Sequence, residues 1–230
     1  MDSVENRLEP YWVVTVATRT AYDRQQTYTI PIKGEEVREV TVLGQKLIVP
    51  SKGNPSLTLN GMEHCVEERR VTRFFDGLSG QKTDLSRYQS FAKTEITDLA
   101  QFTPEEILVV PPQMRATAIV RQVLGEVIQP VLKAQIILEE RVDVEAIELN
   151  LRPVYALEYE WTSKGKRVVV EFDALLGDIR TGGRKWSDQI KGILTRDLFF
   201  DVTADAIGMI VPGGSIAVKL VKAVVDRGRK

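Results

Sequence analysis

Two stretches of the chain alternate apolar and polar residues, each close to a proline and each interrupted by a short polar segment. The first comprises residues 9–16 and 27–32, and the second comprises residues 152–161 and 167–173. A period of two is typical of β-strands, and a short polar interruption between two such runs is typical of a turn. Each stretch therefore predicts a β-hairpin with one apolar face.

Longer periods indicate helices elsewhere in the chain. Residues 113–129 place apolar side chains on one broad face and polar side chains on the other, which predicts an amphipathic helix that Pro130 ends or kinks. Residues 202–211 and 215–226 predict two further helices joined by a Pro-Gly-Gly turn, and the second of them is apolar on nearly all sides. Residues 61–112 fit helical stripes less regularly and predict a connector of helices and loops.

Together these elements predict an α+β fold. We expect antiparallel sheets built from two similar proline-led β-hairpins, with helices packed on one face and a helical C-terminal tail. The expected segments are an N-terminal sheet region (residues 1–60), the mixed connector (61–112), a helix-plus-hairpin module (113–180) and the tail (181–230), and all four can also form one compact domain. Residues 131–143 fit a helix or a strand equally well.

The composition is that of an ordinary globular protein, and it narrows the class of partner. The chain has 230 residues, of which 43% are hydrophobic, so it can bury a core without metals or disulfides. The net charge of −1 provides no overall attraction to nucleic acid, so no nucleic-acid partner is expected. The single cysteine, Cys65, cannot form an internal disulfide, and residues 1–7 lack the apolar region of a signal peptide. Both observations favour a cytoplasmic location.

The ionisable residues form no recognisable catalytic constellation. His64 and Cys65 are the only histidine and the only cysteine, and they are adjacent in sequence. A zinc site needs three or four ligands, and a nucleophile needs a base placed beside it by the fold. We therefore expect no cofactor, no metal and no catalytic residue, and we predict that the protein is not an enzyme. A carboxylate-based enzyme is the weaker alternative.

The order of helix and second hairpin resembles the PepSY domain. In that family a helix packs on a β-hairpin whose second strand ends in a turn containing Asp and Gly. The resemblance covers about residues 113–180 and rests on Val168, Val170, Phe172, Asp173 and Gly177. Asp178 stands where the family often has Glu, and Leu176 replaces the usual Thr. PepSY-like modules are generally non-catalytic and bind or inhibit peptidases or act as sensor domains, so the resemblance implies a binding or regulatory role.

The outer face of the second hairpin is acidic. If Lys164-Gly165 forms the central turn, the face carries four carboxylates and places two of them directly opposite each other: Glu158, Glu160, Glu171 and Asp173. Like charges in opposite positions are unfavourable, so this face is suited to a basic partner or to a weakly held divalent cation. The plainer alternative is that it is the solvated face of an antiparallel sheet.

A glycine-rich basic loop follows the second hairpin and leads into a predicted helix. Such loops bind anions when their backbone amides converge, and the residues concerned here are Arg180, Gly182, Gly183, Arg184 and Lys185. The Gly-Lys-Ser/Thr ending of a nucleotide-binding P-loop is absent, so a solvated linker is the alternative.

The sequence as a whole predicts a non-enzymatic binding or regulatory module that acts on an unknown protein partner or on itself. The alternative is a membrane-associated or self-assembling effector that uses the apolar C-terminal helices. Their basic end (residues 227–230) is suited to anionic headgroups. The plainer interpretation of those helices is packing on the sheets or in a homo-oligomer interface.

Overall fold

The computed structural model describes residues 3–50, 55–97, 102–181 and 220–225. Of the residues that the structure describes, 58% are in strands and 12% are in helices, and these residues contain one α-helix. The predicted α+β class, with several helices on one face and a helical tail, is therefore wrong. This part of the chain is mostly antiparallel β-sheet.

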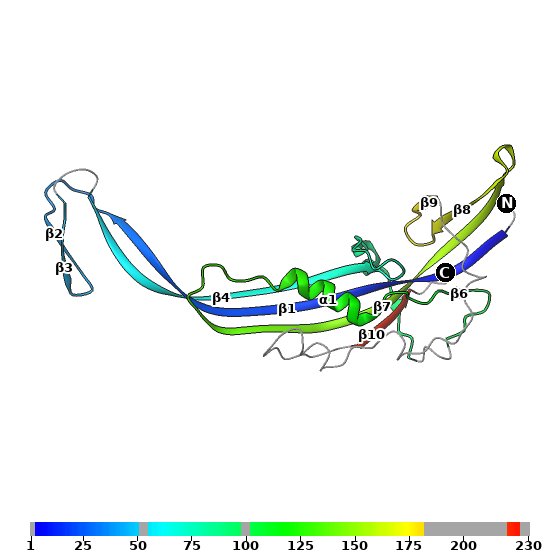
Figure 1. Ribbon diagram of the computed structural model, residues 1–230, viewed down its shortest axis with the longest axis horizontal. Coiled ribbons are helices and arrows are strands. Elements are labelled where there is room, and N and C mark those ends of the chain that lie inside the picture. Colours follow the sequence, from blue (N-terminus) through cyan, green and yellow to red (C-terminus); the bar gives the residue numbers. More distant parts are fainter. Residues whose placement is uncertain (1–2, 51–54, 98–101, 182–219, 226–230) are drawn as a thin grey trace. The chain divides into compact units, whose positions relative to one another are not determined.

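The described strands are β1 (Ser3–Pro31), β2 (Glu39–Val42), β3 (Gln45–Ile48), β4 (Ser56–Asp76), β5 (Lys93–Thr94), β6 (Leu108–Val109), β7 (Ile136–Trp161), β8 (Lys166–Asp173), β9 (Ile179–Thr181) and β10 (Leu220–Val225). The helix α1 spans Ala116–Val127, and the short 3-10 helices η1 and η2 span Ser86–Ser90 and Thr162–Lys164. The large sheet has the order β4-β1-β7-β10-β5, with β6 on β1 and with β8 and β9 extending from β7 (Figure 1). Strands β2 and β3 form a separate pair.

The chain divides into two compact units. Unit 1 comprises residues 1–18, 69–129 and 141–230, and unit 2 comprises residues 19–68 and 130–140. The three long strands β1, β4 and β7 contribute residues to both units.

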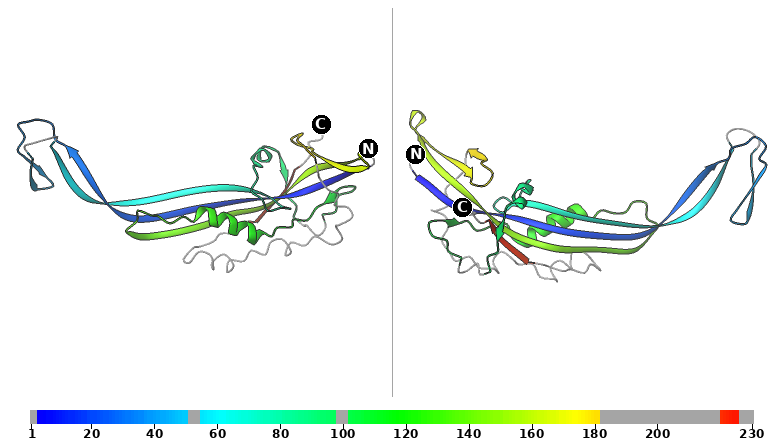
Figure 2. Two further views of the ribbon diagram at one scale, coloured as in Figure 1. Left: turned by 45° about the horizontal axis from the view of Figure 1, so that its top comes forward. Right: turned by 180° about the vertical axis from the view of Figure 1, so that it is seen from behind.

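In unit 1 the main core lies between α1 and one face of the sheet, which we call the helix face. Strand β1 contributes alternate residues to it, among them Leu8, Trp12 and Val14. Helix α1 contributes Ile119 and Val123, both fully buried. The predicted amphipathic helix is thus confirmed: α1 lies within residues 113–129, and its apolar stripe packs on the sheet. Figure 2 shows α1 and the η1 segment on opposite sides of the long strands.

Strand β7 contains a change of parity. Val142 and Val144 are buried in the main core, but further along the strand Ile147, Leu149 and Leu151 take their place. One residue more than strict alternation allows therefore lies between Val144 and Ile147, which is the signature of a β-bulge. The bulge keeps both halves of this long strand facing the same core.

The opposite face of unit 1, which we call the charged face, has a smaller apolar cluster. Tyr11 and Val13 of β1 pack there against Leu85 and Tyr88, with the partly buried Leu175 nearby. The odd-numbered residues of β1 thus build one face and the even-numbered residues build the other, as a strand requires.

Unit 2 shows why the first predicted hairpin does not exist. The polar segment after Val16 is not a turn but a continuation of β1, and its polar side chains bond to the antiparallel neighbour β4. Three contacts run in opposite directions along the two strands at four-residue steps: Arg19 with Glu68, Asp23 with His64, and Thr27 with Asn60. These cross-strand pairs let a polar stretch remain extended.

Two other predicted helical regions are strands. Residues 61–76 belong to β4, where Leu57 and Phe75 are buried near its two ends. Residues 220–225, predicted as part of a C-terminal helix, form β10, which pairs in parallel with β7 and in antiparallel with β5. The remainder of the predicted tail lies outside the described residues. No helix in the part of the chain that the structure describes is long and apolar enough to cross a membrane.

Two glycines test the packing of unit 1. A Cβ atom at Gly77 would lie 2.6 Å from the carbonyl oxygen of Pro10, whereas a Cβ atom at Gly125 in α1 would meet nothing within 4 Å. We expect Gly77→Ala to lower the free energy of unfolding by about 1–3 kcal/mol through overpacking. The matched Gly125→Ala should raise it by about 0.5–1 kcal/mol, because alanine favours helix. Urea denaturation measures both, and equal effects of the two variants would contradict this packing.

Candidate functional site

The charged face of unit 1 buries ionisable groups in an alternating row. Along β1, Glu5, Arg7 and Glu9 occupy successive positions on this face, and all are at most 9% exposed. Glu9 lies between two guanidinium groups: its Oε1 is 2.6 Å from Arg7 Nη2, and its Oε2 is 3.0 Å from Arg152 Nη2. One carboxylate therefore joins β1 to β7.

Arg7 connects this row to strand β8. Its Nη2 donates to Glu171 Oε1, and its Nη1 lies 3.4 Å from Glu5 Oε1. Burial alone would lower the pKa of Arg7, but the nearby carboxylates of Glu9 and Glu171 outweigh it, and the pKa is raised. The guanidinium stays charged, and its function here is to neutralise buried carboxylates.

Arg152 connects β7 to the η1 segment. Its Nη1 donates to the hydroxyl oxygen of Tyr88 at 3.4 Å, and its guanidinium carbon lies 5.8 Å from the centre of the Tyr88 ring. Tyr88 in turn donates its hydroxyl proton to Asp173 Oδ2, and Asp173 Oδ1 accepts the backbone N–H groups of Leu175 and Leu176 at 2.9 Å. Asp173 therefore orders the turn after β8.

Two tyrosines on this face have raised pKa values. Burial, with the hydrogen bond to Asp173 next, raises the pKa of Tyr88 to about 12. Burial also raises the pKa of Tyr11, and the hydroxyl of Tyr11 has no hydrogen-bond partner among the described residues. Both phenols are neutral at physiological pH, as an unperturbed tyrosine also is, and burial moves their pKa values further above that range.

The four predicted carboxylates do share one face, but the register of the hairpin differs from the prediction by two residues. Glu158 pairs with Val169 rather than Glu171, Ala156 pairs with Glu171, and Glu160 pairs with Arg167. The reason is the connection: Thr162–Lys164 form a 3-10 turn, so the loop is longer than a two-residue turn. The expected clash of Glu158 with Glu171 does not occur.

The environments of these carboxylates differ. Asp173 is buried against Tyr88, and Glu171 is bound by Arg7. Glu158 accepts a hydrogen bond from Ser3 Oγ at 3.1 Å, and Glu160 is exposed. Two of the four therefore belong to the buried network and two lie at its rim.

The remaining predicted sites are mostly separate from this face. Arg180 lies exposed in β9 opposite Glu171, while Gly182, Gly183, Arg184 and Lys185 lie outside the described residues. His64 lies in unit 2, where its Nδ1 is 2.6 Å from Asp23 Oδ1, and the half-buried Cys65 is a free thiol.

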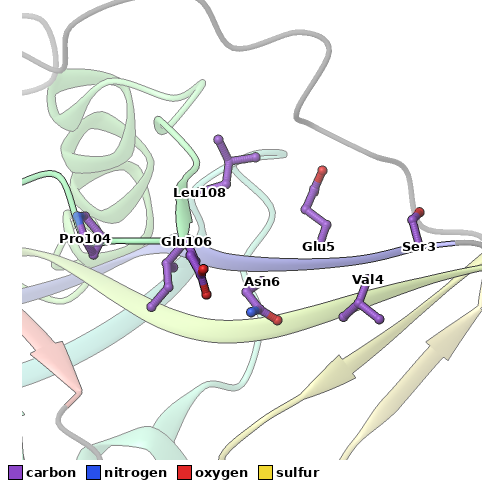
Figure 3. Close-up of a pocket in the computed structure, with 8 residues that line it drawn as sticks. Ser3, Val4, Glu5, Asn6, Pro104, Glu106 and Leu108 are labelled. Carbon is purple, nitrogen blue, oxygen red and sulfur yellow. The ribbon is translucent and has the colours of Figure 1, made fainter.

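A pocket opens beside the N-terminal end of β1, in unit 1 (Figure 3). It is an open hollow with a volume of about 530 Å³, and it is lined by Ser3, Val4, Glu5, Asn6, Pro104, Glu106, Ile107 and Leu108. Its apolar walls come from Val4, Ile107 and Leu108, and its two ionisable groups are both carboxylates. None of the four predicted carboxylates is part of this lining, although Ser3 joins it to Glu158.

The sequence interpretation missed the buried guanidinium groups. Arg7 and Glu9 alternate with Leu8 and Trp12, so the period of two already placed them on one face of a strand. The alternation does not show which residue each of these ionisable groups pairs with, because the partner can be distant in sequence: Arg152 lies 143 positions from Glu9.

No group of three or more His, Cys, Asp or Glu side chains suited to a metal ion occurs among the described residues. No family model, curated protein or solved structure matches the chain. The resemblance to PepSY therefore stays a prediction.

The two tyrosines provide a matched pair of variants. Tyr88→Phe removes the hydrogen bond to buried Asp173, and we expect it to lower the free energy of unfolding by about 1–3 kcal/mol. Tyr11→Phe removes a buried hydroxyl without a partner among the described residues, so it should be neutral or slightly stabilising. Chemical denaturation at neutral pH measures both. A larger loss for Tyr11→Phe would rule out this assignment.

The raised pKa of Tyr88 also predicts an alkaline pH dependence. An unfolded tyrosine ionises near pH 10, whereas Tyr88 in the folded chain ionises at about 12. The contribution of neutral Tyr88 to the free energy of unfolding is complete below pH 10. It is lost as the pH rises to 12, at up to about 1.4 kcal/mol per pH unit. The difference in unfolding free energy between wild type and Tyr88→Phe should shrink over this window. A difference that is constant from pH 9 to pH 12 would contradict a raised pKa.

Proposed function

We propose that the chain is a non-enzymatic binding module that accepts a basic, extended protein segment in the pocket beside β1. The observation that carries the proposal is the lining of this pocket, where Glu5 and Glu106 stand among apolar walls. A Lys or Arg side chain combines an apolar stem with a cationic head, so it matches both parts of such a lining.

The backbone beside the pocket supports an extended ligand. Strand β6 pairs in parallel with β1 only at Arg7 and Leu8, and Val110 N–H donates to Leu8 C=O at 3.0 Å. Alternate residues of a strand direct their backbone groups to the same edge. Asn6 and Val4 therefore direct theirs to the same edge of β1 as Leu8, at positions with which β6 does not pair. An added strand could continue the pairing there and place its basic side chains near the carboxylates.

The buried network holds this edge in place. Arg7 and Glu9 follow the pocket residues directly along β1, and their ion pairs join β1 to β7 and β8. A site on a strand held in this way is organised before its ligand arrives, which lowers the entropic cost of binding.

The test compares labelled peptides of equal length by fluorescence anisotropy. Apolar residues alternate with Lys in the first peptide, with Gln in the second and with Glu in the third. We expect only the Lys peptide to bind, with an affinity that falls as salt is added. The double variant Glu5→Gln, Glu106→Gln should weaken binding about tenfold, because it removes both carboxylates of the pocket and keeps their shape.

The control for this experiment is Glu160→Gln, which removes one exposed carboxylate that is not part of the pocket lining. It should leave the affinity unchanged. Equal binding of the Lys and Glu peptides, or no binding of any peptide, would refute the proposed function.

A further inference from the structure

Strand β4 is an edge strand of the large sheet. It stands at one end of the strand order, next to β1, and Figure 1 shows it in cyan along the border of the long strands. Its outer edge is covered at the C-terminal end, where Thr83 N–H donates to Phe74 C=O at 3.1 Å and Asp76 N–H donates to Gln81 C=O at 2.9 Å. No other described strand pairs with that edge. A long open edge is a template for another strand.

The same bonds show which backbone groups point outward. Phe74 and Asp76 direct theirs to the outer edge, whereas Gly77 N–H donates inward to Pro10 C=O of β1 at 3.0 Å. Because alternate residues of a strand point to the same edge, the even-numbered residues from His64 to Thr72 present their N–H and C=O groups outward. Two copies of β4 paired about a twofold axis must therefore oppose residues of equal parity, and the axis passes through a residue.

We propose that a second copy of this chain pairs with β4 in antiparallel orientation, with the twofold axis at Glu68. In this register Glu67 lies opposite Arg69 of the second copy, and the symmetry repeats this pair. About ten backbone hydrogen bonds between the outward-pointing residues 64–72 hold the two strands together. The contact lies entirely on β4, so it is separate from the pocket of unit 1.

The sequence of β4 is self-complementary in this register. Glu63 lies opposite Arg73 of the second copy, and Cys65 lies opposite Val71 of the second copy. With the Glu67 pair, every opposition of odd-numbered residues from 63 to 73 places opposite charges or apolar side chains face to face. Within their own chain Glu63 is also bonded by Arg24 and Glu67 by Tyr22, so the new pairs would share these carboxylates. Opposite charges at facing positions stabilise a strand pair, and the pattern ends where residues 81–83 cover the edge.

On the face that carries the even-numbered residues, one pair of like charges is opposed: Glu68 faces Glu68 of the second copy. Each Glu68 already forms an ion pair with Arg19 of its own chain, and Arg70 of the second copy is a diagonal neighbour. Moving the axis to Arg69 instead opposes two arginines and places Glu67 opposite Val71, which loses its ion pair. Of these two registers, the one with the axis at Glu68 is therefore favoured.

A cysteine scan tests the register on the full chain. Cys65 is the only cysteine, and in the proposed pair it lies opposite position 71 in a non-hydrogen-bonded position, where the Cα separation suits a disulfide. Oxidation of Val71→Cys should yield a covalent dimer linked between positions 65 and 71, identified by peptide mass mapping. The matched control Thr72→Cys places the new thiol on the other face and should not yield a link to position 65. Linkage by the control alone, or by neither variant, would overturn the proposal.

Charge reversal provides a second measurement that needs no new thiol. Sedimentation velocity over a range of concentrations should show a wild-type dimer, and Glu67→Arg or Arg69→Glu alone should weaken it about tenfold, because each reversal turns two attractive pairs into repulsive ones. Mixing the two single variants restores both pairs, so the mixture should form a heterodimer of wild-type affinity. A wild type that is monomeric throughout, or a mixture that stays dissociated, would refute the pairing.

Discussion

Unit 1 depends on the ion pairs that one buried carboxylate, that of Glu9, forms with Arg7 and Arg152. This carboxylate satisfies two guanidinium groups at once, and both are almost fully buried, so their permanent charge has to be compensated by carboxylates instead of water. Through Arg7 the connection reaches β8, and through Arg152 it reaches the η1 segment and Asp76. Loss of one member leaves an uncompensated charge in the interior, which typically costs about 3–5 kcal/mol. The charged face is therefore held together by chemistry that the apolar helix face does not need.

The elements predicted correctly are those whose pattern is local. Residues 113–129 carry the full amphipathic period of a helix, and α1 lies within them. The second hairpin was predicted from alternation on both sides of Gly165, and its faces are correct because a register error of two residues keeps every side chain on its face. The error itself came from the turn, since nothing in the sequence distinguishes a 3-10 turn at Thr162–Lys164 from a tighter one.

The elements predicted wrongly are those that depend on partners distant in sequence. The polar run after Val16 has the composition of a turn, and it is a strand because Arg19, Asp23 and Thr27 find partners on β4. The candidate site was limited in the same way: Glu171 and Asp173 were placed on one face, but the groups that hold them, Arg7 and Tyr88, come from other parts of the chain. A pattern shows which face a residue occupies but not what lies across from it.

The constant register between β1 and β4 limits how the gene for this protein can change in length. One codon inserted in the middle of either strand would exchange the two faces for the rest of that strand, so buried arginines and core valines would change places. Residues 32–55 connect the two strands, and outside the paired strands β2 and β3 they have no such limit, because their length does not affect the pairing before and after them. Insertions and deletions should therefore accumulate in that connection. Within the strands they should be tolerated only where a bulge such as the one after Val144 absorbs the extra residue.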